Sequence, residues 1–193
     1  WIIEQDLYCA DKSWHEKLFF ALFNSVTTRS AGLSTMDLSD FSIPTQIFLS
    51  ILMFIGGSPS STGGGIRTTT FALIILTIAT YARGKNEVRV LGRSLLQEDI
   101  LKSFVVFTVA IILVMISIIS LHVVELQRFT LTEIVFEVTS AFGTCGLSTG
   151  ITGELSTAGK TIIMFLMFIG RVGVLSLLFI FQTKKRKENV HYP

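Results

Sequence analysis

Two short glycine-centred segments carry the residues best suited to chemistry. They read "SAGL" at residues 30–33 and "TCGL" at residues 144–147. Backbone carbonyls in an extended loop replace the hydration shell of a cation, and such a loop needs no charged ligands. It does need residues that tolerate unusual backbone angles, which Gly32 and Gly146 provide. The pattern therefore predicts two ion-coordinating loops. The alternative is that each segment is a plain turn.

An internal repeat places both segments in the same context. When the chain is shifted by 114 residues, "SAGLST" at 30–35 falls on "TCGLST" at 144–149. The same shift brings "LMFIG" at 52–56 onto "LMFIG" at 166–170. This period is too long for a solenoid. The repeat therefore indicates a duplicated unit, each copy having one glycine-centred loop followed by one apolar segment.

A third segment, "FIGGSPSSTGGGIRTTTF" at residues 54–71, interrupts apolar sequence. The apolar stretches beside it, 43–55 and 71–81, would cover about 20 and 16 Å as helices, so neither crosses a bilayer core of roughly 30 Å alone. Together they form one crossing that is broken near its middle. Non-helical backbone at that depth is tolerated only where protein buries it or water reaches it. The alternative is a pair of core helices in a soluble domain.

Two other segments are long enough to cross a membrane. Residues 100–121 are nearly all apolar and would extend about 33 Å as a helix. Residues 162–181 form the second span, with Arg171 at its middle. Two shorter apolar stretches, 18–26 and 134–142, end in turns rich in Gly, Ser and Thr, which predicts re-entrant helices. Only 16% of the residues are charged, against roughly a quarter in soluble domains. The composition therefore also indicates a membrane protein.

The predicted fold class is an all-α membrane protein built from span–pore loop–span repeats. About one and a half repeats are present: residues 1–93 supply a pore helix, a loop and the broken second span, and residues 94–193 supply a whole unit with a basic tail. We expect the span that precedes the first pore helix to lie upstream of Trp1. Lys and Arg concentrate after the broken crossing and after the last span, so the positive-inside rule predicts a multi-pass protein with a cytoplasmic C-terminus.

Several classes of function are disfavoured. A net charge of only +2, without a basic face, argues against nucleic acid binding. Cys9 and Cys145 are isolated thiols, and no histidine has the spacing of a metal ligand. The glycine-rich segment with Arg67 lacks the Lys-Ser/Thr pair and preceding strand of a phosphate-binding loop. We therefore expect no enzyme activity and no organic cofactor.

The chain resembles the Trk, Ktr and HKT superfamily of potassium transporters, and most of all its KtrB-type membrane subunits. The segments that carry the resemblance are "VTTRSAGLST", "ILMFIGGSPSSTGGGIRTTTF", "SAFGTCGLSTGIT" and "FLMFIGRVGVLSL". The resemblance covers nearly the whole chain. It implies four span–loop–span repeats around one pore, of which this chain holds part of the third and all of the fourth.

The resemblance also implies gated K+ translocation through a carbonyl-lined filter centred on Gly32 and Gly146. A Gly at both positions favours K+, whereas a Ser in one repeat marks Na+ permeation in some relatives. Cys145 stands where Val is usual and is expected to act as a small buried hydrophobe. A Na+ or mixed monovalent-cation transporter, or a non-conducting scaffold, are the alternatives. The expected filter residues are Ser30, Ala31, Gly32, Leu33, Thr144, Cys145, Gly146 and Leu147.

By the same resemblance, the broken segment is an intramembrane gate under the filter, contacted by Arg171. A charge at mid-bilayer costs about 2.5–3.5 kcal/mol, so Arg171 must face a partner or water, and free loop carbonyls are natural acceptors. The alternative is that another helix satisfies this charge. We also expect Arg29 and Glu137 to pair and brace the two loops. The expected gate residues are Gly56, Gly57, Gly63, Gly64, Gly65 and Arg171.

Partners follow from the resemblance alone. It implies a homodimer in the plasma membrane, a cytoplasmic nucleotide-binding subunit of the KtrA type, and Na+ as a candidate activator. The basic inner segments are where such a subunit would dock, an inference by analogy.

Overall fold

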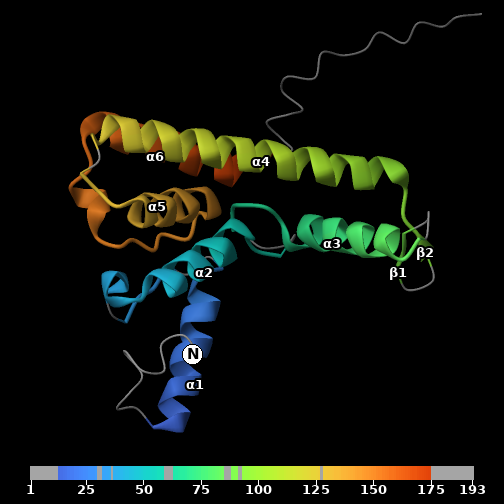
Figure 1. Cartoon of the computed structure of the whole chain (residues 1–193), viewed down its shortest axis with the longest axis horizontal. Coiled ribbons are helices and arrows are strands. Elements are labelled where there is room, and N and C mark those ends of the chain that lie inside the picture. Colours follow the sequence, from blue (N-terminus) through green and yellow to red (C-terminus); the bar gives the residue numbers. More distant parts are fainter. Residues whose placement is uncertain are drawn as a thin grey trace, which may run out of the picture.

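The computed structural model describes residues 13–29, 32–35, 37–58, 63–84, 88–90, 93–126 and 128–174. These residues are predominantly helical, as predicted (Figure 1). Two short antiparallel strands between residues 89 and 94, of two residues each, were not predicted from the sequence. The elements are α1 (Trp14–Thr27), η2 (Leu38–Asp40), α2 (Ile43–Phe54), α3 (Thr68–Ala82), β1 (Arg89–Val90), β2 (Arg93–Ser94), α4 (Gln97–Val124), α5 (Leu131–Gly143), η3 (Ile151–Gly153) and α6 (Thr157–Val172).

The predicted span at 100–121 is α4, which has 28 residues and therefore extends about 42 Å. Glu98 and Asp99 lie in its first turn, where acidic side chains suit the helix dipole, and both lie within ion-pair distance of Lys102. Within the described part of the chain, α4 is the helix that is long and apolar enough to cross a membrane. This segment confirms the prediction of a long apolar helix.

The predicted span at 162–181 differs from the structure. Its helix, α6, ends at Val172, and Gly173 then adopts φ 85° and ψ 136°. An α-helix requires negative φ, so the helix is interrupted two residues after Arg171. The prediction of one continuous helix is therefore wrong at Gly173. The remainder of the predicted span, from residue 175 onward, lies outside the described residues.

The broken crossing is present as α2 and α3, joined by the glycine-rich loop. The two ends of this loop lie together, because the Ile66 amide donates to the Phe54 carbonyl at 3.2 Å. The Thr68 amide likewise donates to the Gly57 carbonyl at 3.3 Å. The chain therefore leaves α2, forms a loop whose two ends are joined at a closed neck by these hydrogen bonds, and enters α3. Helix α3 begins three residues before the predicted start.

Helix α5 lies at the centre of the packing, in contact with α2, α4 and α6 (Figure 1). Its N-terminus is fixed by a capping box, in which Thr130 and Glu133 exchange hydrogen bonds. From Phe136 to its end every residue is buried. Two glycines permit close approach, since a Cβ on Gly143 would strike the backbone of Met53, and a Cβ on Gly170 would strike the backbone of Phe142.

The 114-residue repeat is visible in the elements. Ser42 is the N-cap of α2 and Ser156 the N-cap of α6, and the shift brings one onto the other. The turn η2 precedes α2 as η3 precedes α6. The predicted short helices at 18–26 and 134–142 are α1 and α5. The two copies therefore share one local design.

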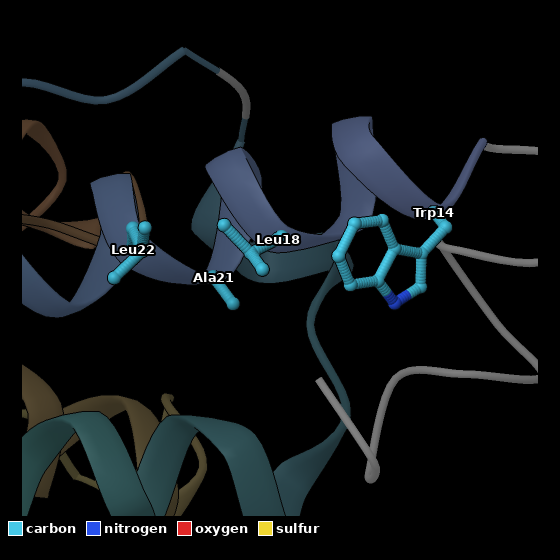
Figure 2. A pocket seen from close by; sticks show the side chains of 4 residues that line it. All are labelled: Trp14, Leu18, Ala21 and Leu22. Atoms are coloured by element: carbon cyan, nitrogen blue, oxygen red, sulfur yellow. The ribbon is translucent and has the colours of Figure 1, made fainter.

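The two copies differ in how their short helix is covered. Helix α1 extends away from the other helices and exposes apolar side chains along its length (Figure 1). Trp14, Leu18, Ala21 and Leu22 line a shallow pocket of about 320 Å³ on one side of it (Figure 2). The equivalent helix, α5, is enclosed by three neighbours.

Candidate functional site

The two glycine-centred loops meet in the structure. Gly32 has φ 62° and Gly146 has φ 89°, angles that favour glycine in both cases. A Cβ on Gly32 would collide with the Cys145 carbonyl oxygen and would lie 3.4 Å from the Gly146 Cα. Glycine at position 32 is therefore required both by backbone angle and by space. The first two residues of this segment, Ser30 and Ala31, lie outside the described residues.

The first loop is held by the end of α1. The Thr27 hydroxyl donates to the Leu33 carbonyl at 2.6 Å, and the Gly32 amide donates to the Thr27 carbonyl at 3.4 Å. Thr27 is buried, whereas the Leu33 side chain is exposed. The loop is thus fixed through its backbone.

The second loop begins at the C-terminus of α5. Thr144 adopts the left-handed conformation, with φ 50° and ψ 36°, and the Cys145 amide donates to the Ser140 carbonyl at 3.0 Å. The Cys145 side chain is buried, as predicted, and its thiol donates to the Thr28 carbonyl. Leu147 is also buried. Two contacts, the Cys145 thiol with Thr28 and the Cys145 carbonyl with Gly32, therefore join the loops of the two repeats.

Glu137 holds residues 148–152, which follow the second loop. Its buried carboxylate accepts hydrogen bonds from the Ser148 hydroxyl, from the Thr149 amide at 3.2 Å and from the Thr152 hydroxyl at 2.9 Å. Three hydrogen bonds to one carboxylate hold residues 148–152 against α5. Glu137 therefore braces its own repeat, and within the described part of the chain the expected pair with Arg29 is not formed.

Arg29 instead contacts the first end of the glycine loop. Its guanidinium Nη1 donates to the carbonyls of Ile55 at 2.7 Å and Gly56 at 3.2 Å. Ile55 is the C-cap of α2, where backbone carbonyls lack partners within the helix. The cation also suits the negative end of the helix dipole. The structure thus gives Arg29 the kind of contact that the sequence led us to expect of Arg171.

The second end of the glycine loop lies against the second glycine-centred loop. The Gly64 amide donates to the Thr144 hydroxyl at 2.8 Å. A Cβ on Gly64 would lie 2.6 Å from the Thr144 Cγ2 and 2.9 Å from the Gly170 carbonyl oxygen, so no larger residue fits there without movement. Gly65 adopts φ 77°, and Gly56 packs against the Gly64 carbonyl. No pattern in the sequence predicts this contact, which joins positions 64 and 144.

The remaining predicted gate residues are placed as follows. The Gly57 carbonyl accepts from Thr68, and Gly63 precedes the contact with Thr144. Arg171 is exposed on α6, directly after Gly170, whose carbonyl borders Gly64. Residues 59–62, which any bond from Arg171 to the tip of the loop would involve, lie outside the described residues. The contact between Arg171 and the loop stays a prediction.

Glu125 is a residue that the sequence did not single out. Its side chain is buried and accepts from the Ser156 amide at 2.9 Å and from the Ser156 hydroxyl at 2.7 Å. It therefore joins the end of α4 to the start of α6. Gly159 makes room for this carboxylate, which a Cβ there would strike. Among the described residues, no group of three or more His, Cys, Asp or Glu side chains is placed to hold a metal ion.

Comparison with known proteins identifies the family. The family model TrkH, described as "Cation transport protein", matches residues 1–192. The chain is 52% identical over 184 residues to "Ktr system potassium uptake protein D" of Bacillus subtilis, covering 95% of this chain and 40% of that protein. It is 41% identical over 178 residues to "Ktr system potassium uptake protein B" of the same organism, covering 92% and 39%.

Two further comparisons extend this result. "Potassium/sodium uptake protein NtpJ" of Enterococcus hirae is 36% identical over 179 residues, covering 92% of this chain and 40% of that protein. The crystal structure of the potassium transporter TrkH from Vibrio parahaemolyticus matches with a TM-score of 0.76 at 19% identity, over 94% of this chain and 40% of that chain. The chain thus spans about two fifths of the length of these proteins.

These findings confirm the predicted family and fold class. The structural match shows that the helices are arranged as in a TrkH transporter. The relatives are named as uptake proteins, which are transporters and not enzymes. The chain belongs to the TrkH family of cation transport proteins.

Proposed function

We propose that this chain forms part of the pore of a potassium uptake protein, through which K+ moves down its electrochemical gradient. The observation that carries the proposal is the meeting of two glycine-centred loops, at Gly32 and Gly146, each directly after a short helix. The C-terminal end of a helix has a partial negative charge that favours a cation. The names of the Ktr relatives, which are potassium uptake proteins, support the choice of ion.

In this proposal, backbone carbonyls of the two loops replace part of the hydration shell of K+. Side chains that buttress the loops, such as Glu137 and Thr27, hold the carbonyls in position. The other half of the filter would come from two further repeats of a longer protein. The residues proposed to contribute are Ser30, Ala31, Gly32 and Leu33 in the first loop, and Thr144, Cys145, Gly146 and Leu147 in the second.

We further propose that the glycine loop gates this pathway. The loop touches Thr144 at the start of the second filter loop, which supports a place directly beside the filter. Gly56, Gly57, Gly63, Gly64 and Gly65 would give it mobility. Arg171, one residue beyond the contact of Gly64 with α6, would repel K+ and slow its passage while the gate is closed.

The exposed face of α1 supports the proposed architecture of repeats. Helix α5 is covered by three helices. One is α2, from the preceding repeat, and the other two are α4 and α6, from its own repeat. By the same pattern, α1 would be covered by helices equivalent to α2 and α4, which α2 to α6 do not supply. A longer protein, in which this chain spans about two fifths of the length, would supply them.

The second candidate function is transport of Na+ or of both ions. The name of the Enterococcus hirae relative, a potassium/sodium uptake protein, favours it. Selectivity depends on all the loops of the filter, so a mixed transporter is compatible with two glycine-centred loops. A Na+-activated K+ transporter is a third form of the same proposal.

Location and partners belong to the proposal as well. We propose a multi-pass protein of the cell membrane with a cytoplasmic C-terminus, acting as a homodimer with a KtrA-like nucleotide-binding subunit. The 28-residue apolar helix α4 supports the membrane location. Resemblance to Ktr systems supports the partners.

The test is uptake by the full-length protein that contains this chain, in cells that lack K+ uptake and are starved of K+. Uptake of Rb+ as a K+ tracer should be restored and should be competed by K+ more strongly than by Na+. Stronger competition by Na+ would favour the second candidate. Membrane-inserted wild-type protein that restores uptake of neither ion would indicate a non-conducting scaffold and would overturn the proposal.

A further inference from the structure

We infer that Arg29 and Thr144 clamp the two ends of the glycine loop and thereby couple its position to the occupancy of the filter. This inference rests on the proposed function, because it treats the glycine-centred segments as ion-binding loops. Each clamp residue directly borders one of those segments: Arg29 comes just before the first, and Thr144 begins the second. The two segments of one pore are thus tied to opposite ends of one loop.

The contact at the first end consists of two hydrogen bonds from a charged donor and is partly buried. Arg29 donates to two successive carbonyls, those of Ile55 and Gly56, at the point where α2 stops. Hydrogen bonds from a charged donor are about twice as strong as neutral ones. A movement of this end away from the filter would leave both carbonyls and the cation without these bonds. Arg29 therefore links the end of α1 to the start of the glycine loop.

The contact at the second end is a single neutral hydrogen bond in a tight fit. Thr144 is held in the left-handed conformation at the C-terminus of α5, so its hydroxyl has a fixed place. It accepts from the Gly64 amide, and Gly64 has no space for a side chain on that side. The bond is therefore available only while the loop lies against the filter.

The two ends of the glycine loop are joined to each other. Gly56 packs against the Gly64 carbonyl, and the Ile66 amide bonds to Phe54, so the neck of the loop is closed. A shift of the loop must then break the bond to Thr144 or displace Thr144 itself. Because Thr144 belongs to the proposed filter, binding of K+ there and closure of the loop must favour or oppose each other reciprocally.

The experiment measures hydrogen–deuterium exchange of the purified full-length protein in K+ buffer and in a large organic cation buffer. In the wild type, exchange of the peptide containing Gly64 should differ between the two buffers. Thr144→Val removes the acceptor and keeps the volume. It should raise exchange of this peptide roughly three- to tenfold, the change expected for one neutral hydrogen bond, and should abolish the dependence on K+. Thr144→Ser keeps a hydroxyl and should restore both properties.

Thr108→Val is the matched control. Thr108 lies exposed on α4, and among the described residues its hydroxyl bonds only to the Phe104 carbonyl within its own helix. This variant should behave as the wild type. If Thr144→Val does not fold, Arg29→Gln tests the other end of the clamp by the same measurement, and Arg29→Lys should partly restore it.

The outcomes separate the inference from the function on which it rests. If the wild type transports K+ but exchange at Gly64 is the same in both buffers, the coupling is wrong while the proposed function stands. If Thr144→Val keeps the K+ dependence, the clamp at this end is wrong. Failure of the wild type to transport any cation would overturn the proposed function itself.

Discussion

Replacement of Gly170 by Ala tests the packing that sets the shape of the site. The new Cβ would collide with the Phe142 carbonyl oxygen and would lie 3.0 Å from the Phe142 carbonyl carbon and 3.3 Å from its Cα. Carbon atoms in contact lie about 3.5–4.0 Å apart, so α6 must move away from α5 by roughly 0.5–1 Å. Both obstacles are backbone, which cannot rotate aside. Overpacking of this kind costs about 1–3 kcal/mol.

The assay is unfolding of the purified full-length protein, together with Rb+ uptake. Gly170→Ala should lower stability by the stated amount and should alter uptake, because the Gly170 carbonyl also borders Gly64. Gly153→Ala is the control, since a Cβ at Gly153 meets nothing within 4 Å. Equal stability of the two variants would refute the close backbone packing of α6 on α5.

Three other predictions concern side chains and the loop. Glu137→Gln removes the charge that three donors share, so we expect a reduced ratio of Rb+ to Na+ uptake; an unchanged ratio would mean that Glu137 does not shape the filter. Glu125→Ala leaves the Ser156 amide and hydroxyl without their acceptor and should cost about 1–3 kcal/mol in the free energy of unfolding. A double-mutant cycle with Ser156→Ala measures the shared part, and additive effects would contradict the contact. Gly64→Ala should change the rate of K+ flux while selectivity is retained, and unaltered flux would reduce the glycine loop to an ordinary helix break.

Patterns along the chain predicted where the helices lie, apart from the end of α6. Length and hydropathy identified α4, and the repeat identified α1 and α5 as equivalent short helices. The need for glycine at Gly32 and Gly146 was also predictable, and both residues have positive φ. Each of these properties is local, because hydropathy and backbone preference are carried by neighbouring residues.

Contacts between distant residues were not predictable. Arg29 and Arg171 are both arginines near mid-membrane segments, and nothing in their neighbours shows which one reaches the carbonyls of Ile55 and Gly56. The bond between Gly64 and Thr144 joins two repeats and depends on how α5 packs between α2 and α6. Only the three-dimensional arrangement brings these groups together.

The helix break at Gly173 shows a different limit. The segment 162–181 is predominantly apolar and carries a single charge, Arg171, so its composition predicts an uninterrupted span. A single glycine with φ 85° ends the helix, although glycine is also common inside membrane helices. Composition therefore gives the length of the apolar stretch but not the conformation of one residue within it.

The central claim is that the two glycine-centred loops bind the transported cation. Rb+ scatters anomalously and substitutes for K+, so crystals of the full-length protein grown in Rb+ locate the ion directly. The account predicts anomalous peaks between the loop containing Gly32 and Leu33 and the loop containing Thr144, Cys145 and Gly146, reduced when Na+ replaces Rb+. Ordered loops without Rb+ between them, with Rb+ bound elsewhere along the pathway, would contradict it.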